Sequence, residues 1–497
     1  MIFLLMLNML ACTQSEFGDT KINEEIKITN ETIITDETQV FVDEISKINV
    51  VMGAQVSSGG ERPLQYDNFE ALEAQASSEE LIALTDHPNG VVRCYAFWAL
   101  SLSDSVDLYS IVIDHIDDTA RVETQFGCSV SYDRVGDFFI NVVTPHSIDL
   151  EAQKLNEAQL AMLDSILLFE ANFLSAKFDA MSSAEPTAAL YPKFREMVIE
   201  ENDQNALVQL AKYQKAQDIE LILNYRGDAD GDEDGYFYTY RAIAEFPHPR
   251  FLPLLKNNLE KTLDKTHYSN EWKGLYKAIV RYKNEYAVAM LQVPFTKVKH
   301  ENIKGYHIDY VFKALEENQD PIYDDLLWRL WEEELRMTPS VYYYLKAKDS
   351  SRTFSLTKEC LLNIDAFYGA NMSFQSRNEA GSDSLISLML DDVLLQDEAA
   401  GIMIIRKNIL EANVHIYEIF TDHIHKLKDP SFVPPLFEQL EKEWNVHIYL
   451  EIVKALISYE DKAINQQILA TIKINDNLTI GQGESALSRL LENNGIR

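Results

Sequence analysis

From about residue 68 onward, the chain alternates apolar and polar residues at the spacing of one helical face. Between residues 78 and 100, for example, Val92, Ala96 and Ala99 recur three or four positions apart and so share one side of a helix. Ser78 is placed to cap a first helix, and a Pro-Asn-Gly turn precedes the second. Strand-like alternation is scarce in this range. The pattern predicts a succession of amphipathic helices joined by short turns.

Two distant segments of the chain are alike. Residues 249–261 and 430–442 share Pro, Phe, Pro, Leu, Leu, Glu and Lys in register. The segments that follow them, 277–282 and 454–459, also correspond, and a weaker copy begins at Asp320. A helix pair of this kind cannot bury its apolar face alone, so the copies must stack into a continuous core. The repetition predicts an all-α solenoid of antiparallel helix pairs.

The two matched copies place their apolar residues at the same positions, which predicts equivalent core residues. We expect Lys261 and Lys442, at the ends of the copies, to be exposed. The apolar stripes are Leu252, Leu255, Leu259 and Leu263 in one copy and Val433, Leu436, Leu440 and Trp444 in the other.

The helix after the Pro-Asn-Gly turn resembles the inner helix of a HEAT repeat, in which small alanines let paired helices approach closely. The matching residues are Pro88, Val91, Arg93, Ala96 and Ala99. The resemblance implies an armadillo-type α-solenoid over residues 66–497. Residues 156–180 form an apolar helical stretch without repeat features, which is either a divergent repeat or a break between two arrays divided near 150–185.

The first eleven residues form an apolar leader that is too short to span a bilayer as a helix, and they predict a signal peptide. Leu10, Ala11 and Cys12 resemble a bacterial lipobox, which implies that Cys12 is acylated and becomes the mature N-terminus. The alternative, a buried helix start, is disfavoured by the polar residues 13–19. These features predict a lipid-anchored protein of the bacterial cell envelope, periplasmic or surface-exposed and not cytoplasmic, which meets the membrane through its N-terminal lipid.

Residues 12–65 are polar and acidic, which predicts a largely disordered tether. Partial alternation of β-branched residues at 31–42 predicts a strand within it. Beyond Cys12 only Cys94, Cys128 and Cys360 remain, too few for a disulfide scaffold. Cys94 lies in an apolar helical run and is expected to be a buried thiol, with a Cys94–Cys128 bridge as the alternative.

The net charge of the chain limits the classes of macromolecule that it is expected to bind. The chain of 497 residues has 44 Lys and Arg against 79 Asp and Glu, for a net charge of −35. A field of that sign repels phosphate backbones, so nucleic-acid binding is not expected. It would steer a basic protein partner toward the chain instead.

One acidic segment resembles the opening of an EF-hand calcium loop. Asp230, Asp232 and Asp234 occupy its first, third and fifth positions, and Gly235 occupies the sixth. The twelfth position is Arg241, where a glutamate is expected. The segment is therefore either a solvated acidic turn or a weak calcium site, and no other cofactor is predicted.

Two tyrosine clusters contain too many consecutive rings for all of them to be buried on one face, so some are expected to line a partner-binding surface. These residues are Tyr236, Tyr238, Tyr240, Tyr342, Tyr343 and Tyr344. His423 and His425 point to different helical faces and do not form a metal chelate. The sequence contains neither a His-Glu-x-x-His zinc motif nor a Gly-x-Ser-x-Gly nucleophile elbow.

These observations favour a binding protein over an enzyme. The prediction is a lipid-anchored, extracytoplasmic HEAT-repeat protein that acts as a protein-binding scaffold or as an inhibitor or immunity-type module. The alternative is an exported hydrolase that uses carboxylates on the helical solenoid. It would need a deep pocket with two convergent carboxylates of different pKa, whereas a scaffold needs a broad surface.

Overall fold

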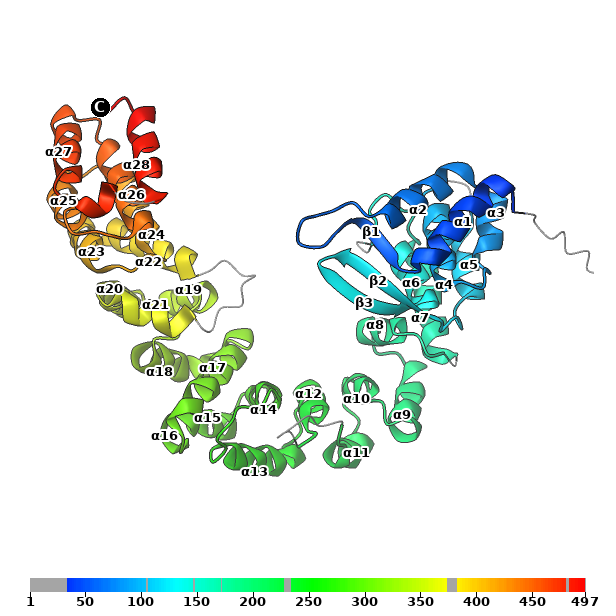
Figure 1. Ribbon diagram of the computed structural model, residues 1–497. Coiled ribbons are helices and arrows are strands. Elements are labelled where there is room, and N and C mark those ends of the chain that lie inside the picture. The colour runs from blue at the N-terminus through cyan, green and yellow to red at the C-terminus, as the bar shows by residue number, and fades with distance from the viewer. Residues whose placement is uncertain are drawn as a thin grey trace, which may run out of the picture. The chain divides into compact units, whose positions relative to one another are not determined.

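The computed structural model describes residues 34–103, 106–145, 148–170, 172–227, 234–372, 382–479 and 482–496. Within these residues the chain is mainly helical and contains one three-stranded sheet (Figure 1). The prediction of an all-α fold is confirmed, with this small sheet as an addition. The chain divides into two compact units, Met1–Ser183 (unit 1) and Ala184–Arg497 (unit 2). The boundary after Ser183 falls within the range 150–185, for which the sequence leaves open a divergent repeat or a break between two arrays.

The described residues of unit 1 combine eight helices with the sheet. The helices are α1 (Asp36–Ile48), α2 (Leu64–Gln75), α3 (Ser78–Leu84), α4 (Gly90–Ser101), α5 (Leu108–Asp114), α6 (Val135–Val143), α7 (Glu157–Phe169) and α8 (Ala176–Ser183). The strands are β1 (Val51–Val56), β2 (Arg121–Gly127) and β3 (Ser129–Arg134), in the order β1-β2-β3. Strand β2 is parallel to β1 and antiparallel to β3.

Helix α4 is the centre of unit 1, because nearly every one of its side chains is buried. It packs against α2, α3 and α6. On the α2 side, Phe69 stacks on Trp98 with ring centroids 4.6 Å apart and on Tyr95 at 5.1 Å. Cys94 is a buried free thiol and Cys128 is an exposed free thiol, so the buried interpretation of Cys94 is confirmed and the alternative bridge is wrong.

The start of unit 1 differs from the sequence prediction. We expected a disordered tether over 12–65 with a strand at 31–42, but the described part of this range forms α1 and β1. Thr35 caps α1 by accepting a hydrogen bond from the amide of Thr38, and Ile45 on its inner face is fully buried. The hydroxyl of Tyr95 pairs with both the amide and the carbonyl of Met52, which ties β1 to α4.

The first helix pair of the sequence analysis is present with a one-residue correction. Ser77, and not Ser78, is the N-cap of α3, and its hydroxyl accepts a hydrogen bond from the amide of Glu80. The Glu80 carboxylate accepts one in return from the amide of Ser77, which completes a capping box. Asn89 caps α4 in a similar way, through the amides of Val91 and Val92.

Unit 2 is helical throughout its described residues. Its helices up to residue 348 are α9 (Leu190–Glu200), α10 (Gln204–Ala211), α11 (Ile219–Asn224), α12 (Phe237–Glu245), α13 (Leu252–Thr262), α14 (Glu271–Val280), α15 (Glu285–Gln292), α16 (Pro294–Lys297), α17 (Glu301–Glu317), α18 (Asp324–Glu334) and α19 (Pro339–Lys348). The remainder are α20 (Ser350–Leu362), α21 (Ile364–Met372), α22 (Ser382–Gln396), α23 (Glu398–Glu411), α24 (Tyr417–Leu427), α25 (Val433–Leu440), α26 (Val446–Ile457), α27 (Lys462–Ile472) and α28 (Gln482–Asn493).

Much of unit 2 is built from helix pairs that stack on one another. The second helices of successive pairs pack together, α10 on α12, α12 on α14 and α14 on α17, and again α24 on α26 and α26 on α28. In each pair, the first helix comes before the second helix in the chain. Among the first helices, α23 packs on α25, and α25 packs on α27. Figure 1 shows the same succession of neighbouring helices within the unit. This arrangement is compatible with a helical solenoid.

The repeated segments found in the sequence have the same local structure. Each begins with a 3-10 turn that has proline at its first position, at Pro249–Phe251, Pro321–Tyr323 and Pro430–Phe432, and continues directly into α13, α18 or α25. The aromatic residue that ends each turn is fully buried. The predicted equivalence is confirmed for the buried pairs Leu255 with Leu436 and Leu259 with Leu440, and for the exposed Lys261 and Lys442.

Trp444 is the exception in the predicted stripe, because its side chain is 73% exposed. Helix α25 ends at Leu440, so the helical spacing that would place Trp444 beside Leu440 no longer applies. The inclusion of Trp444 among the core residues was therefore wrong.

A tyrosine follows three of the second helices and bonds back to the start of the same pair. Each hydroxyl donates a hydrogen bond to a main-chain oxygen near the start of the first helix, from Tyr213 to Thr187 (2.8 Å), from Tyr282 to His248 (2.8 Å) and from Tyr459 to Asp429 (2.7 Å). The next residue is left-handed in every case, with φ of 51° at Gln214, 45° at Lys283 and 55° at Glu460. These shared bonds show that the three pairs are copies of one structural unit.

In the part of the chain that the structure describes, none of the helices is both long and apolar enough to cross a membrane.

Candidate functional site

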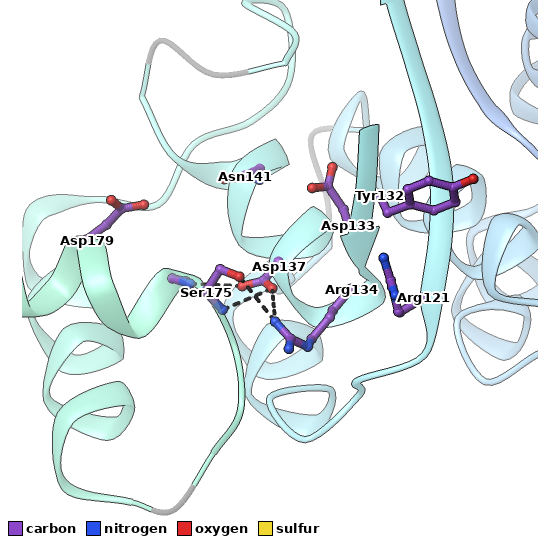
Figure 2. A pocket seen from close by; sticks show the side chains of 9 residues that line it. Arg121, Tyr132, Asp133, Arg134, Asp137, Asn141, Ser175 and Asp179 are labelled. Carbon is purple, nitrogen blue, oxygen red and sulfur yellow. Dashed lines mark hydrogen bonds and ion pairs between the residues drawn. The ribbon is translucent and has the colours of Figure 1, made fainter. Parts of the chain in front are cut away.

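A polar pocket of about 250 Å³ lies in unit 1 between the β2–β3 hairpin and helices α6 and α8. Figure 2 shows it from close by, with charged side chains from the hairpin and α6 opposite α8. Its lining residues are Arg121, Tyr132, Asp133, Arg134, Asp137, Asn141, Ser175, Ala176 and Asp179. We call this the polar pocket.

The hairpin places two arginines side by side at its open end. Gly127, with φ of 58°, allows the tight turn between the strands, and the resulting register pairs Arg121 with Arg134. Like charges directly opposite each other destabilise a sheet, so each guanidinium needs another partner. Arg121 lies over the ring of Tyr132, 5.1 Å from its centroid, and Arg134 donates a 3.1 Å hydrogen bond to the hydroxyl of Ser175.

Asp137 connects α6 to the start of α8 at one side of the polar pocket. Its carboxylate accepts hydrogen bonds from the amides of Ser175 (3.0 Å) and Ala176 (2.9 Å), which belong to the start of α8. Arg134 lies 3.7 Å from the same carboxylate, and Asp137 is only 5% exposed. The dashed lines in Figure 2 mark these contacts. Asp137 therefore positions α8 against α6.

Asp133 is the carboxyl group of the polar pocket that is most suited to holding a proton. Burial raises its pKa, and the negative charge of Asp137 adds to the effect, whereas a hydrogen bond from Thr124 opposes it. Both oxygens of Asp137 accept hydrogen bonds from the amides that begin α8, and Asp179 of α8 is a third carboxyl group that lines the pocket. The pocket therefore brings three carboxyl groups together with the two guanidinium groups of the hairpin.

A second, more open cavity of about 760 Å³ adjoins the polar pocket. The two share Arg121 and Tyr132, so this cation–π pair forms the wall between them. The open cavity reaches the start of α4 at Asn89 and Gly90.

Some residues of the predicted sites lie outside the described part of the chain. These are the lipidation residue Cys12 and the first two calcium ligands, Asp230 and Asp232. The third, Asp234, is described and exposed, and its amide donates a 3.1 Å hydrogen bond to the carboxylate of Glu271. Among the described residues, no group of three His, Cys, Asp or Glu side chains is placed to hold a metal ion. Calcium binding stays a prediction.

The first tyrosine cluster is divided between surface and core. Tyr236 is half-buried at the start of α12, where Arg226 lies 3.8 Å from its ring centroid and donates to its hydroxyl. Tyr238 is also half-buried. Tyr240 is a core residue at 3% exposure, and its hydroxyl accepts a hydrogen bond from Asn258.

The second cluster divides in the same way. Tyr342 is buried in α19, and its hydroxyl donates a 2.6 Å hydrogen bond to Asp392. Tyr344 is half-buried and donates to Asp324 at 2.6 Å. Tyr343 is 55% exposed. Six tyrosines were predicted to bind a partner, but Tyr240 and Tyr342 are buried and are core residues. Partner binding stays a prediction for the other four tyrosines.

Further exposed groups lie where the second helices of unit 2 begin. The amides of Asp234 and Tyr236, at the start of α12, both bond to Glu271 at the start of α14. Tyr268, just before α14, stacks on Tyr306 of α17 with ring centroids 4.5 Å apart. Tyr268 is 50% exposed and Tyr306 is 41% exposed. The starts of α12, α14 and α17 thus form a continuous edge with exposed aromatic rings.

A third cavity, of about 380 Å³, lies at the starts of α24 and α26. We call it the tandem cavity, and its lining residues are Val414, His415, Tyr417, Glu418, Asn445, His447 and Glu451. The sequence analysis missed these residues, although a signal was present. The sequence Asn-Val-His-Ile-Tyr occurs at residues 413–417 and again at 445–449, followed by glutamate at 418 and 451.

Comparison of the chain with protein-family models, with curated proteins and with solved structures finds no match.

Proposed function

We propose that this chain is a lipid-anchored, extracytoplasmic protein of the HEAT-repeat type that binds a protein partner along unit 2. It acts as a scaffold or as an inhibitor or immunity-type module. The lipid on Cys12 would hold it at the membrane surface of the bacterial envelope, and the helical array would present the binding surface.

The observation that supports this proposal is the row of second-helix starts in unit 2, which we call the second-helix edge. It is defined by Tyr236, Tyr268, Tyr306, His415 and His447, none of which is buried. Stacked repeats place equivalent positions side by side, so a partner can contact several pairs at once. Exposed tyrosines suit this task because a rigid ring contributes a large contact area and a hydroxyl group.

Charge favours a basic partner. A net charge of −35 attracts positively charged proteins at long range and raises their association rate. The stacked pair Tyr268 and Tyr306 is exposed and apolar on its faces, so it can contribute short-range contacts after this encounter.

A photo-crosslinking experiment tests the proposal. The full chain would carry benzoylphenylalanine at Tyr268 or Tyr306 and would be irradiated in the cells that naturally make it. Tyr286 of α15, which is 71% exposed, and the exposed Lys442 are the controls away from the second-helix edge. We expect one adduct of defined mass from the two edge positions and none from the controls. Adducts that are equal at all four positions, or absent at all four, would overturn the proposal.

A further inference from the structure

One stretch of unit 2 has a charge opposite in sign to that of the whole chain. Residues 256–307, which run from α13 into α17, contain ten Lys and Arg against five Asp and Glu. The whole chain has 44 against 79. A strongly acidic chain gains its solubility from its negative charge, and a local reversal of sign does not add to it. Solubility therefore does not explain the cations of this stretch.

Three of these cations lie in a row on the outer side of α14. Lys273, Lys277 and Arg281 are spaced four residues apart, so their side chains share one side of the helix. None of the three is buried. The fully buried Leu275 and Ile279 lie on the opposite side of α14. The row therefore faces away from the core and toward solvent.

Helix α12 adds a fourth cation beside this row. Helices α12 and α14 pack together and run in the same direction, from the contact of Tyr240 with Gly274 to the hydrogen bond between Ala244 and Arg281 (Figure 1). Arg241 is exposed and lies one turn before Ala244, so it is beside the middle of the row. We call the four residues the basic strip, which consists of Arg241, Lys273, Lys277 and Arg281.

Most of the charge of the basic strip is not neutralised. Lys277 forms an ion pair with Glu317 of α17, at 2.6 Å. Among the described residues, no carboxylate forms an ion pair with the other three members. The guanidinium of Arg241 lies 5.4 Å from the ring centroid of Tyr238, a contact that leaves its charge in place. Carboxylates are nearly twice as frequent as cations in this chain, so three adjacent cations without a carboxylate partner indicate an anionic ligand.

Arg281 is held in position by groups that do not neutralise it. Its Nε donates a 3.0 Å hydrogen bond to the main-chain oxygen of Ala244, and its Nη1 donates one of 3.2 Å to the side-chain oxygen of Asn318, just after α17. Both acceptors are uncharged, so the guanidinium is fixed between three second helices and keeps its charge. These bonds use two of its five N–H donors. A positioned guanidinium with further donors is what a paired contact with a carboxylate requires.

We propose that the basic strip binds an acidic segment of the protein partner, with Arg281 bonded to one carboxylate and Arg241 and Lys273 to its neighbours. This inference rests on the proposed function and extends the second-helix edge along α12 and α14. The net charge of the chain attracts basic surfaces at long range, so a partner that fits both has a basic surface and an acidic segment. A nucleic acid is negative along its whole length and is repelled by the rest of the chain.

The test uses the full chain and three rhodamine-labelled probes, which are hexaglutamate and hexaglutamine peptides with blocked ends and heptathymidylate, a DNA strand with as many negative charges as hexaglutamate. Binding is measured by fluorescence anisotropy at pH 7.5 and physiological salt, which screens distant charges. We expect hexaglutamate to bind most tightly. The double variant Arg241→Gln/Lys273→Gln leaves the bonds of Arg281 intact and should weaken this binding about tenfold, the range for two charge-assisted contacts near a surface. Arg281→Gln should weaken it by a similar factor.

A matched control removes the same amount of charge from a first helix. Lys256→Gln/Lys261→Gln changes two exposed residues of α13, and we expect it to change the affinity less than twofold. Equal losses in both double variants would show attraction by net charge only and would overturn the proposal. Equal binding of hexaglutamine, no binding of hexaglutamate, or tighter binding of heptathymidylate would also overturn it. Crosslinking at Tyr268 and Tyr306 does not depend on these results, so the proposed function can survive when this inference fails.

Discussion

The hydroxyl of Tyr282 donates a hydrogen bond to the main-chain oxygen of His248, at 2.8 Å. This bond joins the end of α14 to the turn that precedes α13, and Tyr459 makes the same bond to Asp429 in another pair. Removing the hydroxyl leaves each carbonyl with only a main-chain donor, the amide of Phe251 or of Phe432. Tyr282→Phe and Tyr459→Phe should therefore each lower the free energy of unfolding by about 0.5 to 1.5 kcal/mol, the net contribution of one hydrogen bond. Urea unfolding followed by circular dichroism measures the loss.

Tyr286→Phe is the control for this prediction, because Tyr286 is 71% exposed. It should leave the unfolding midpoint unchanged. If the two buried-bond variants unfold at the same urea concentration as Tyr286→Phe, the tyrosine bonds do not stabilise the pairs.

Two glycines should respond in opposite ways to the same substitution. A Cβ atom at Gly483 of α28 would lie 1.6 Å from the hydroxyl oxygen of Tyr449, so Gly483→Ala forces the helices apart and should cost about 1 to 3 kcal/mol. Gly305 is exposed within α17 and has no atom within 4 Å of its Cβ position, so Gly305→Ala should stabilise the chain by about 0.5 to 1 kcal/mol. Thermal unfolding of both variants checks the signs. A stable Gly483→Ala variant would contradict the packing of α28 on α26.

Glu80 should make unit 1 sensitive to acid. Hydrogen bonds from the amide of Thr35 and the amide of Ser77 lower its pKa from 4.5 to about 2. Because the pKa is lower in the folded state, this carboxylate stabilises the fold above about pH 4.5, and the contribution is lost as the pH falls toward 2. Glu80→Gln should therefore cost about 1 to 3 kcal/mol at pH 7 and much less at pH 2.5.

The exposed neighbour Glu79 provides the comparison. Urea unfolding at several pH values should show a pH-dependent difference between the original chain and Glu80→Gln, and almost none for Glu79→Gln. A difference that stays constant from pH 7 to pH 2.5 would mean that the Glu80 charge does not contribute.

Cys12 should carry the lipid. Mass spectrometry of the mature N-terminus is expected to show an acylated cysteine, and Cys12→Ala should move the protein out of the membrane fraction, because the anchor is then lost. Cys128→Ala, which changes an exposed thiol of the described residues, should not alter fractionation. An intact Met1 in the membrane-bound protein would contradict lipidation.

Calcium should bind weakly to the acidic loop. Calorimetry of the full chain is expected to show a dissociation constant on the order of a millimolar, the range of weak extracellular sites, because Arg241 stands where a glutamate ligand is expected. Asp232→Asn should abolish the heat, whereas Asp228→Asn, outside the ligand positions, should not. Equal heats in both variants would identify a solvated acidic turn.

The repeat copies could be predicted from the sequence because their determinants are local. Pro249 and Pro430 begin the same 3-10 turn, and Leu255 and Leu436 follow at the same helical spacing. The prediction that Trp444 is a core residue was wrong because α25 ends at Leu440 and the helical spacing stops there. No local pattern in the sequence marked the end of this helix.

The sheet and the polar pocket depend on contacts between distant residues. Strand β1 pairs with β2, where Val51 lies opposite Thr124, and Gly53 packs closely on the ring of Phe126. Asp137 meets Ser175 only after α7 and α8 are placed. None of these contacts leaves a periodic pattern in the sequence. In contrast, the repeated Asn-Val-His-Ile-Tyr segment is present in the sequence itself, at residues 413–417 and 445–449.

The pair-by-pair packing of unit 2 has a consequence for how this chain can change through evolution. Each second helix contacts mainly its neighbours in the row, so a duplication or deletion that covers one complete pair leaves the remaining interfaces intact. The left-handed residues that follow Tyr213, Tyr282 and Tyr459 lie in the turns between one pair and the next. These turns are where a whole pair can be inserted or removed. A lineage can therefore lengthen or shorten this array in whole pairs without redesigning the core.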